Sequence, residues 1–244
     1  MIQKIGSLLL LAFMLLTACE SGSSSSKKEG LVKKTDSDGT VTEINYKEGK
    51  KHGVAKTYYS NGNISAEIEY VEGVKQGEAK WYYKDKDELL YQVTNFVDSK
   101  KEGLRTRYHR NGKVMVEIPY KNGGLSIGTK EFSKKGNPIT DHENVKIEVQ
   151  EKNQLKKTGE YILELRLPRG YTKVKWYHGD LTDGSYMNEE LVKIKNEKGV
   201  GTFRIKVPPN TGVTREFNIV AHAKTALGND ILFQQKKTVN ANNY

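Results

Sequence analysis

An internal repeat between residues 39 and 139 is the feature that most constrains how this chain can fold. Aromatic residues recur there every 24 to 26 positions, and a glycine follows each of them seven or eight positions later. The aromatic residues are Tyr46, Tyr70, Phe96 and Tyr120, and the glycines are Gly53, Gly77, Gly103 and Gly128. A period of this length indicates one supersecondary unit stacked on the next, so that each copy contacts mainly its neighbours.

Each copy reads as two β-strands. In residues 64–70 (ISAEIEY) apolar side chains fall on alternate positions, as they do in residues 114–120, which predicts strands with one apolar face. The partner strand reads GVAKTYY in one copy and GEAKWYY in the next. Asn61-Gly62 and Asn111-Gly112 then suit a tight hairpin turn. We therefore predict one long antiparallel meander, with a longer loop where residues 84–87 replace the Asn-Gly pair.

These features resemble the bacterial variant of the MORN (membrane occupation and recognition nexus) repeat. The matching pieces are the turn Tyr70–Gly73, the strand-opening glycine, the aromatic pair and the Asn-Gly dipeptide, over roughly residues 39–139. The resemblance implies a sheet of β-hairpin repeats. Proteins built from this repeat are often described as antitoxins of toxin–antitoxin pairs. The family has no shared catalytic residues, so the resemblance implies none here.

The period is lost from about Asp141, and a second all-β unit is predicted there. The strand candidates are residues 161–167, 174–177, 201–207, 216–223 and 231–239, with a turn at 227–230. Short strands at this spacing favour a β-sandwich, with Trp176 packed between its layers. We expect a disulfide-free immunoglobulin-like sandwich. The predicted fold class is thus all-β: an antiparallel meander of MORN-like β-hairpin repeats at 37–140, followed by an Ig-like β-sandwich at 141–244.

The N-terminus is typical of an exported protein. Lys4 precedes an apolar run at residues 8–16 that is shorter than the about 20 residues of a membrane span. The sequence Leu16-Thr17-Ala18-Cys19 resembles the bacterial lipobox. That resemblance implies cleavage after residue 18 and attachment of diacylglycerol to Cys19, which is the only cysteine of the chain. We predict a signal peptide at 1–18 and a lipidated, flexible Ser-rich tether at 19–36.

The net charge and the predicted cellular location together limit the possible partners. The 244-residue chain has a formal net charge of +10, which in another compartment would favour nucleic acid. Export argues against nucleic acid as a partner. We therefore expect the protein to contact the membrane, through the lipid on Cys19, and to bind an envelope protein or anionic glycan. Glu20 follows the cysteine instead of the aspartate that often retains lipoproteins at the inner membrane. The resemblance therefore favours the outer membrane, if the organism has one.

The sequence gives few signs of a catalytic or metal-binding site. Gly124–Gly128 has the form G-x-S-x-G, but no helix pattern follows it, so Ser126 is interpreted as a loop residue. The five histidines show no metal-ligand spacing. Asp180, Asp183 and Glu189 share one loop in which calcium is conceivable, although an ordinary polar loop is favoured. We expect a non-enzymatic protein without cofactor or metal.

One surface remains as a candidate ligand-binding site. Lysines precede the first three strand-opening glycines, and aromatic residues follow on the next strand. The candidate residues are Lys51, Lys75, Lys101, Tyr58, Trp81 and Tyr82. Stacked at a fixed period, they could hold an anionic polymer or head group. We favour a competing, structural interpretation. In it, the turn lysines protect the sheet from aggregation and the aromatic residues form its apolar face.

Two functional hypotheses follow from these features. The first is an anchored, non-catalytic binding or scaffolding protein of the cell envelope, which acts through both the repeat sheet and the β-sandwich. The alternative is an envelope immunity or antitoxin-like protein that neutralises an exported toxin.

Overall fold

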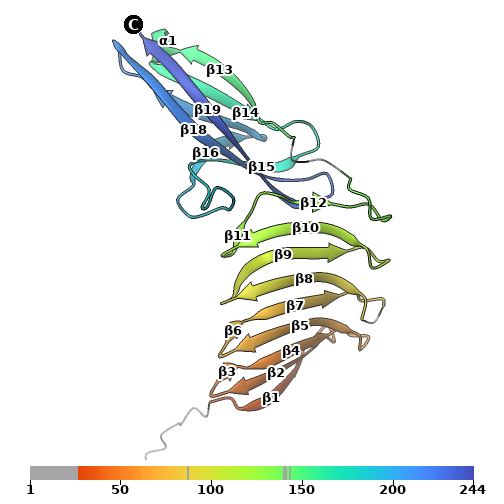
Figure 1. The fold of residues 1–244 in the computed structure, drawn as a ribbon. Helices are drawn as coiled ribbons and strands as arrows, with labels where there is room; N and C mark the ends of the chain where they lie inside the picture. Colours follow the sequence, from red (N-terminus) through yellow and green to blue (C-terminus); the bar gives the residue numbers. More distant parts are fainter. Residues whose placement is uncertain (1–26, 87, 140–141, 143) are drawn as a thin grey trace, which may run out of the picture.

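The computed structural model describes residues 27–86, 88–139, 142 and 144–244. The predicted signal peptide, Cys19 and most of the predicted tether lie outside these residues. The described part is almost entirely β-structure, arranged in two antiparallel sheets that meet end to face (Figure 1). No helix in this part is long and apolar enough to cross a membrane.

The first sheet, called the repeat sheet below, contains twelve strands. They are β1 (Gly30–Thr35), β2 (Val41–Lys47), β3 (Lys50–Lys51), β4 (Gly53–Tyr58), β5 (Ile64–Val71), β6 (Val74–Lys75), β7 (Gly77–Tyr82), β8 (Leu90–Val97), β9 (Lys100–Tyr108), β10 (Val114–Lys121), β11 (Gly124–Leu125) and β12 (Lys130–Glu131). The paired strands follow chain order as β1-β2-β4-β5-β7-β8-β9-β10-β11, while β3, β6 and β12 pair with β2, β5 and β10 beside this path. The predicted meander is confirmed.

Strand β1 corrects the predicted extent of the tether. The flexible tether predicted at 19–36 includes residues 30–35, but these residues pair with β2 over six positions, from Gly30 opposite Tyr46 to Thr35 opposite Val41. The reason is that Leu31 and Val32 interrupt the polar run and supply strand-forming side chains. Residues 30–35 therefore belong to the repeat sheet, and the two residues before them are also bound to it, through Gly49 N to Lys28 O (2.9 Å) and Glu48 N to Glu29 Oε2 (2.8 Å).

The hairpin turns differ between the two edges of the repeat sheet. Along one edge, two-residue turns place both residues in the left-handed region, as at Glu48 (φ 53°) and Gly49 (φ 80°). Such turns match the twist of the strands. At the Asn-Gly edge the loop is wider than the tight turn predicted, because the Tyr59 amide bonds to the Asn63 carbonyl across three residues. The longer loop predicted at 84–87 is confirmed by the bond from Tyr83 N to Leu89 O.

Side chains at this second edge connect each copy to the next. The residue that directly follows β4, β7 or β9 bonds through its side chain to a backbone carbonyl one copy further on. These bonds are Tyr59 Oη to Tyr82 O (2.8 Å), Tyr83 Oη to Tyr108 O (2.7 Å) and His109 Nε2 to Phe132 O (2.9 Å). The repeat sheet is thus held by side chains as well as by its backbone ladder.

The second sheet folds over so that its two ends enclose a core. Its elements are β13 (Glu148–Gln154), α1 (Leu155–Thr158), β14 (Glu160–Arg166), β15 (Thr172–His178), β16 (Val192–Glu197), β17 (Val200–Lys206), β18 (Thr211–Lys224) and β19 (Asp230–Asn243). The strand order is β13-β14-β17-β16-β15-β18-β19. Strand β16 makes the turn between layers, because its first half pairs with β15 and its second half with β17.

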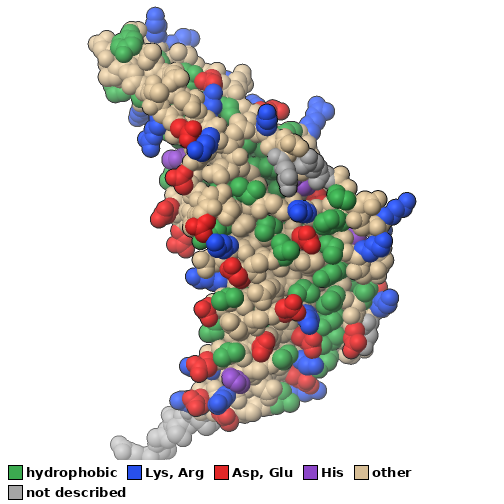
Figure 2. Space-filling model, in the orientation of Figure 1, with side chains coloured by type: hydrophobic (Ala, Val, Ile, Leu, Met, Phe, Trp, Pro, Cys, Tyr) green, Lys and Arg blue, Asp and Glu red, His purple; other side chains and the backbone are tan. Residues whose placement is uncertain are grey.

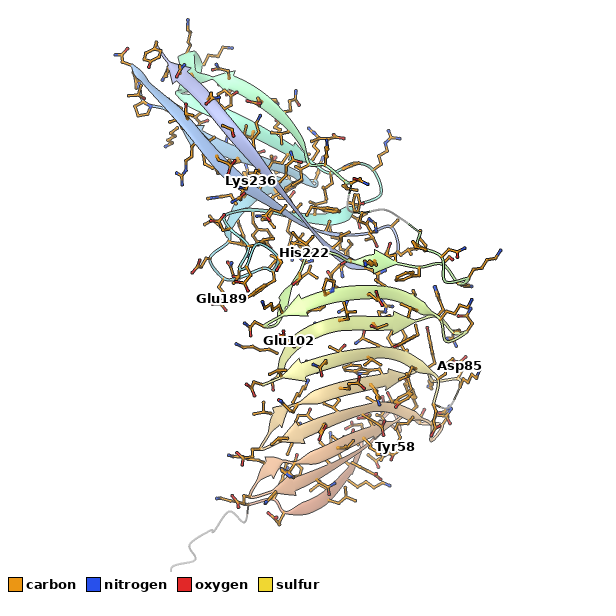
Figure 3. The ribbon with its side chains drawn as sticks, in the orientation of Figure 1. Tyr58, Asp85, Glu102, Glu189, His222 and Lys236 are labelled. Carbon is orange, nitrogen blue, oxygen red and sulfur yellow. The ribbon has the colours of Figure 1, made fainter. Side chains whose placement is uncertain are left out.

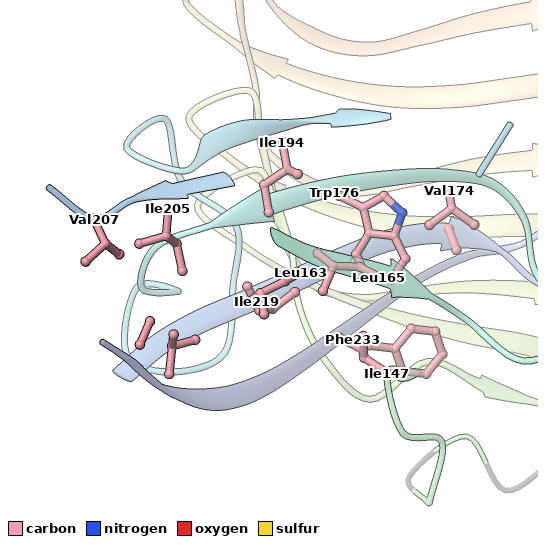
Figure 4. Close-up of a cluster of buried hydrophobic side chains, with 14 of the residues drawn as sticks. Ile147, Leu163, Leu165, Val174, Trp176, Ile194, Ile205, Val207, Ile219 and Phe233 are labelled. Carbon is pink, nitrogen blue, oxygen red and sulfur yellow. The ribbon is translucent and has the colours of Figure 1, made fainter. Parts of the chain in front are cut away.

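Trp176 lies at the centre of that core, as predicted (Figure 4). Its side chain is 1% exposed and packs with Leu163, Leu165 and Ile219. The indole Nε1 donates to the Gly199 carbonyl (2.9 Å). Gly201 makes room for the ring, since a Cβ there would lie 2.7 Å from it.

The two sheets share a second apolar core. Val116 and Ile118 of β10 are fully buried against the outer side of β15, β18 and β19. The other members are Tyr120, Leu125, Tyr177, Leu181, Leu191, Val220 and Leu232. A Cβ on Gly124 would lie 2.3 Å from the Met187 carbonyl oxygen, so the two backbones touch there.

A buried polar cluster adjoins this shared core. The Glu131 side chain is 2% exposed. It accepts hydrogen bonds from Thr225 Oγ1 (2.6 Å) and from Asn229 Nδ2, and its second oxygen lies 3.4 Å from His142 Nε2. Arg107 also donates to Asn229 (3.1 Å). The bonds of Glu131 to Thr225 and Asn229, and of Arg107 to Asn229, join residues more than ninety positions apart, so they fix the second sheet to the end of the repeat sheet.

Candidate binding surface

The two faces of the repeat sheet carry different side chains, because successive residues of a strand point to opposite sides. We call the face that bears Tyr70, Phe96 and Tyr120 the lysine face, since Lys51, Lys75 and Lys101 pair into the same rows. The opposite side, which bears Tyr58, Tyr82 and Tyr108, is called the tyrosine face. Both signs of charge are scattered over the sheet surface seen in Figure 2.

On the lysine face, each predicted lysine covers an aromatic ring of the next copy. The ammonium nitrogens of Lys51, Lys75 and Lys101 lie 5.0, 5.3 and 4.5 Å from the ring centroids of Tyr70, Phe96 and Tyr120. These distances are those of cation–π contacts. Burial, together with the nearby charge of Arg105, lowers the pKa of Lys101.

The backbones of the same lysines also connect neighbouring copies. Their carbonyls accept hydrogen bonds from the next turn of the sheet: Gly73 N to Lys51 O (2.7 Å), Ser99 N to Lys75 O (2.9 Å) and Gly123 N to Lys101 O (2.9 Å). The predicted periodic row of lysines therefore exists. Its geometry gives each of them a contact within the sheet, which fits the structural interpretation better than a free cationic surface.

The structure divides the six predicted ligand-binding residues between the two faces. Trp81 pairs with Ala66 on the lysine face. Tyr58 and Tyr82 lie on the tyrosine face, where their hydroxyls reach Glu43 (3.4 Å) and Glu67 (2.8 Å). Trp81 and Tyr82 are consecutive strand residues, so alternation alone prevents them from sharing a face.

A row of alternating charges crosses the tyrosine face. Lys33, Glu43, Lys56, Glu67 and Lys80 stand opposite one another on β1, β2, β4, β5 and β7. The pairs Lys33–Glu43 and Lys56–Glu67 are each 3.0 Å apart. Burial acts to raise the pKa of Glu67, but the hydrogen bonds from Tyr82 and Lys56 outweigh it and lower that pKa. Glu67 is therefore ionised and internally paired at neutral pH.

A second row on the tyrosine face alternates tyrosine with an aliphatic residue. Tyr58 stands opposite Val41 on one side and Ile64 on the other, Tyr82 stands opposite Leu90, and Tyr108 stands opposite Val114. Figure 3 shows Tyr58 and Asp85 toward the same edge of the sheet, with Glu102 toward the other. The apolar row thus lies toward the Asn-Gly edge, beside the charged row.

These two rows form two open grooves, one copy apart. The first, of about 290 Å³, is lined by Lys33, Gly39, Val41, Glu43, Tyr58, Tyr59, Ser60 and Gly62. The second, of about 540 Å³, is lined by Lys56, Tyr58, Gly62, Ile64, Glu67, Lys80, Tyr82, Glu88 and Leu90. Lysine, aliphatic residue, glutamate and tyrosine occupy equivalent positions in both. The surface therefore presents the same site twice, with Tyr58 shared between them.

Sequence reasoning missed Glu43 and Glu67, although the sequence contains a signal for them. Each lies three positions before the aromatic residue that ends its strand, and Lys56 and Lys80 each lie three positions after the strand-opening glycine. Charged residues at fixed offsets in a repeat fall on one row of the sheet. Aligning the copies by charge as well as by aromatic residue would have revealed the charged row.

The described residues give no support to a catalytic or metal centre. Ser126 is buried at the junction, where its amide donates to Pro119 O (2.9 Å) and its backbone pairs with Tyr186. It does not stand on an exposed strand-to-helix turn. Over residues 27–244, apart from residues 87, 140, 141 and 143, no three His, Cys, Asp or Glu side chains gather closely enough to hold a metal ion.

Comparison with known families supports the repeat assignment. The family model of the MORN repeat variant matches residues 51–72 and 101–122. The first segment runs from β3 through β5, and the second covers β9 and β10. No curated protein matches the chain. Two segments of the repeat sheet are thus similar to the MORN repeat variant, in agreement with the resemblance seen in the sequence.

Proposed function

We propose that this chain is a lipid-anchored, non-catalytic protein of the cell envelope that binds a partner through the tyrosine face of its repeat sheet. The observation that carries the proposal is the pair of equivalent grooves, built from the same residue types in successive copies. A site that recurs with the repeat suits an extended partner that contacts several copies at once. MORN-type repeats favour such a binding or scaffolding role.

The anchor part of the proposal rests on Leu16–Cys19 and the Ser-rich stretch that follows. Lipid on Cys19 would hold the chain at a membrane, with the outer membrane favoured where there is one. We further propose that the second sheet is an immunoglobulin-like sandwich, on the basis of its strand order and the central Trp176. Its firm junction with the repeat sheet would keep the grooves at a defined distance from that sandwich.

Two isoleucines of β5 allow a matched test of the binding face. Ile64 lines the second groove, whereas Ile68 pairs with Ala55 on the lysine face. A photo-crosslinking amino acid is introduced at either position in the full-length chain, expressed in cells. We expect a specific adduct in the envelope fraction from position 64 and none from position 68. Adducts from position 68 alone, or from neither position, would contradict the proposed binding face.

Anchoring is tested separately. Growth with an alkyne-tagged fatty acid should label the wild-type chain, and Cys19→Ser should abolish the label. A wild-type chain that is exported but carries no label would overturn the lipid anchor and leave the binding face to be judged by the crosslinks.

A further inference from the structure

We infer that the tyrosine face binds an uncharged, linear β-1,4-linked polysaccharide that lies across the strands. This inference rests on the proposed binding face and names the chemical class of its partner. The spacing of the tyrosines across the sheet is the first observation that supports it. Tyr58 lies on β4 and Tyr82 on β7, with only β5 between them in the sheet, and Tyr108 follows on β9 after β8. Alternate strands of a sheet are roughly 9.6 Å apart, so the rings recur at that interval.

An extended β-1,4-linked chain of hexopyranoses has a repeat of nearly the same length. Consecutive sugars in such a chain are flipped by about half a turn, so every second sugar presents the same face. Tyrosines on every second strand would therefore meet equivalent sugar faces. A fully extended peptide, in contrast, repeats its side-chain pattern every two residues, or roughly 6.6 Å, which does not match this period.

The tyrosine rings are held in a position suited to stacking. The hydroxyls of Tyr58 and Tyr82 are bound to Glu43 and Glu67, which lie on the same face of neighbouring strands. Each ring is thereby tied along the sheet surface and offers a broad apolar face to a ligand. Ile64 lies between the two tyrosines in the same row, so the sugar between them would also meet an apolar side chain.

The charged row beside the tyrosines supplies the polar contacts. Carboxylate oxygens of Glu43 and Glu67 can accept hydrogen bonds from sugar hydroxyls, and the lysine ammoniums can donate to them. A polysaccharide site needs this combination of apolar faces and a few fixed polar groups. The Glu43 and Glu67 carboxylates are already held in place by their tyrosine and lysine partners, so little order is lost on binding.

Charge decides between a neutral and an anionic ligand. Lys56 and Lys80 face Glu67 and Glu88 in the second groove, and Lys33 faces Glu43 in the first. The formal charges of the lining residues therefore cancel, although the whole chain is basic. The anionic glycan expected from the net charge finds no excess of positive charge in these grooves. An uncharged chain fits them better.

Calorimetric titration of the detergent-solubilised, full-length protein tests this inference. The probes are cellohexaose and chitohexaose, which share the β-1,4 linkage but differ in their N-acetyl groups. Maltohexaose, which is α-linked and curved, is the geometric control. We expect at least one β-1,4 hexamer to bind at least tenfold more tightly than maltohexaose. We also expect its affinity to fall at least tenfold from hexamer to dimer, because a dimer contacts only one tyrosine.

Variants then place the site. The double substitution Tyr58→Ala with Tyr82→Ala should weaken hexamer binding at least tenfold. Tyr46→Ala, a matched loss of tyrosine from the lysine face, should change it less than twofold. Tyr58→Phe with Tyr82→Phe keeps both rings and should retain more affinity than the alanine pair. Circular dichroism on every variant distinguishes lost binding from lost folding.

Several results would overturn the inference. They are equal binding of maltohexaose, unchanged binding by a folded alanine double variant, preferential binding of an anionic polymer such as polygalacturonate, and no binding of either β-1,4 hexamer. If the crosslink from position 64 joins a protein while the glycans fail to bind, the proposed binding face stands and the polysaccharide is excluded. If position 64 gives no adduct, the proposed function itself fails.

Discussion

The third two-residue turn of the repeat sheet is where a single residue departs most clearly from the pattern. The second turn position is glycine at residues 49, 73 and 123, with φ of 80°, 88° and 84°. In the third turn it is Ser99, whose φ is 63°. A residue with a Cβ pays about 1–2 kcal/mol in this region. Ser99 recovers part of that cost, because its Oγ accepts a hydrogen bond from the Lys75 amide (3.0 Å).

Glycine at this position should therefore stabilise the protein slightly. Ser99→Gly removes the backbone strain and loses only an exposed hydrogen bond that water can replace, for a net gain of about 0.5 kcal/mol. Ser99→Ala is the matched control, because it loses the hydrogen bond and keeps the strain. Chemical denaturation should rank the variants as glycine, serine, alanine from most to least stable. An alanine variant more stable than the glycine variant would disprove this account of the turn.

At the scale of elements, the sequence predicts the repeat strands well because their signal is local. The strand predicted at residues 64–70 is observed at Ile64–Val71, and that at 114–120 at Val114–Lys121. What the repeat alone does not show is which side chains share a face. Counting positions separates Trp81 from Tyr82, but the register shift between Thr57 and Tyr58 is needed to place Tyr58 beside Ile64.

Strand β1 is the open edge of the repeat sheet, and its lysines protect it. Among the described strands β1 pairs only with β2, so its outer backbone groups can accept another strand. The Lys33 and Lys34 side chains are 62% and 73% exposed there. Charged residues on such an edge oppose pairing between molecules. Their two positive charges therefore oppose the pairing of β1 with a strand of another molecule.

Replacing both lysines should promote association. Lys33→Val with Lys34→Val removes the repulsion and adds β-branched residues, so we expect oligomers whose fraction rises with protein concentration. Size-exclusion chromatography with light scattering measures this. Lys156→Val with Lys157→Val is the control, because it makes the same change on the exposed helix α1. A double β1 variant that stays in the wild-type assembly state at all concentrations would show that the lysines do not protect this edge.

At the scale of the whole molecule, the junction between the sheets could not be predicted from the sequence. The repeat indicates contacts between neighbouring copies, and alternation indicates a second β unit, but neither signal links them. Glu131 bonds to Thr225 and Asn229 across more than 90 positions. A lone Glu131 before an irregular loop gives no sign of such distant partners. The short strand β12, which positions Glu131, is itself too brief for a pattern to reveal.

Asp230 connects the two sheets electrostatically. Its carboxylate lies 2.9 Å from His222 Nε2, 2.8 Å from Lys224 Nζ and 3.6 Å from Arg105 Nη2 of the repeat sheet. The hydrogen bond with His222 outweighs the opposing effect of burial and, with help from Lys224, holds the pKa of Asp230 far below its usual 3.8. Because the folded pKa is lowered, the stabilisation is complete above pH 3.8. It is lost as the pH falls below that value.

Asp230→Asn should therefore make the protein less stable than wild type at neutral pH, and this difference should shrink in acid. We expect the free energy of unfolding of the variant to be about 1–3 kcal/mol lower than that of wild type at pH 7, because hydrogen bonds to a charged group are lost. The difference from wild type should narrow as the pH falls below 4, because the Asp230 carboxyl of the unfolded wild-type chain then takes up a proton while the folded one stays ionised. Urea unfolding at pH 7, 5 and 3 measures both effects.

Asp183→Asn, at an exposed pair with Lys121 (2.7 Å), is the control and should change stability by less than about 0.5 kcal/mol at pH 7. A difference for Asp230→Asn that is the same at pH 7 and pH 3 would show that packing, and not the ionised carboxylate, holds the junction.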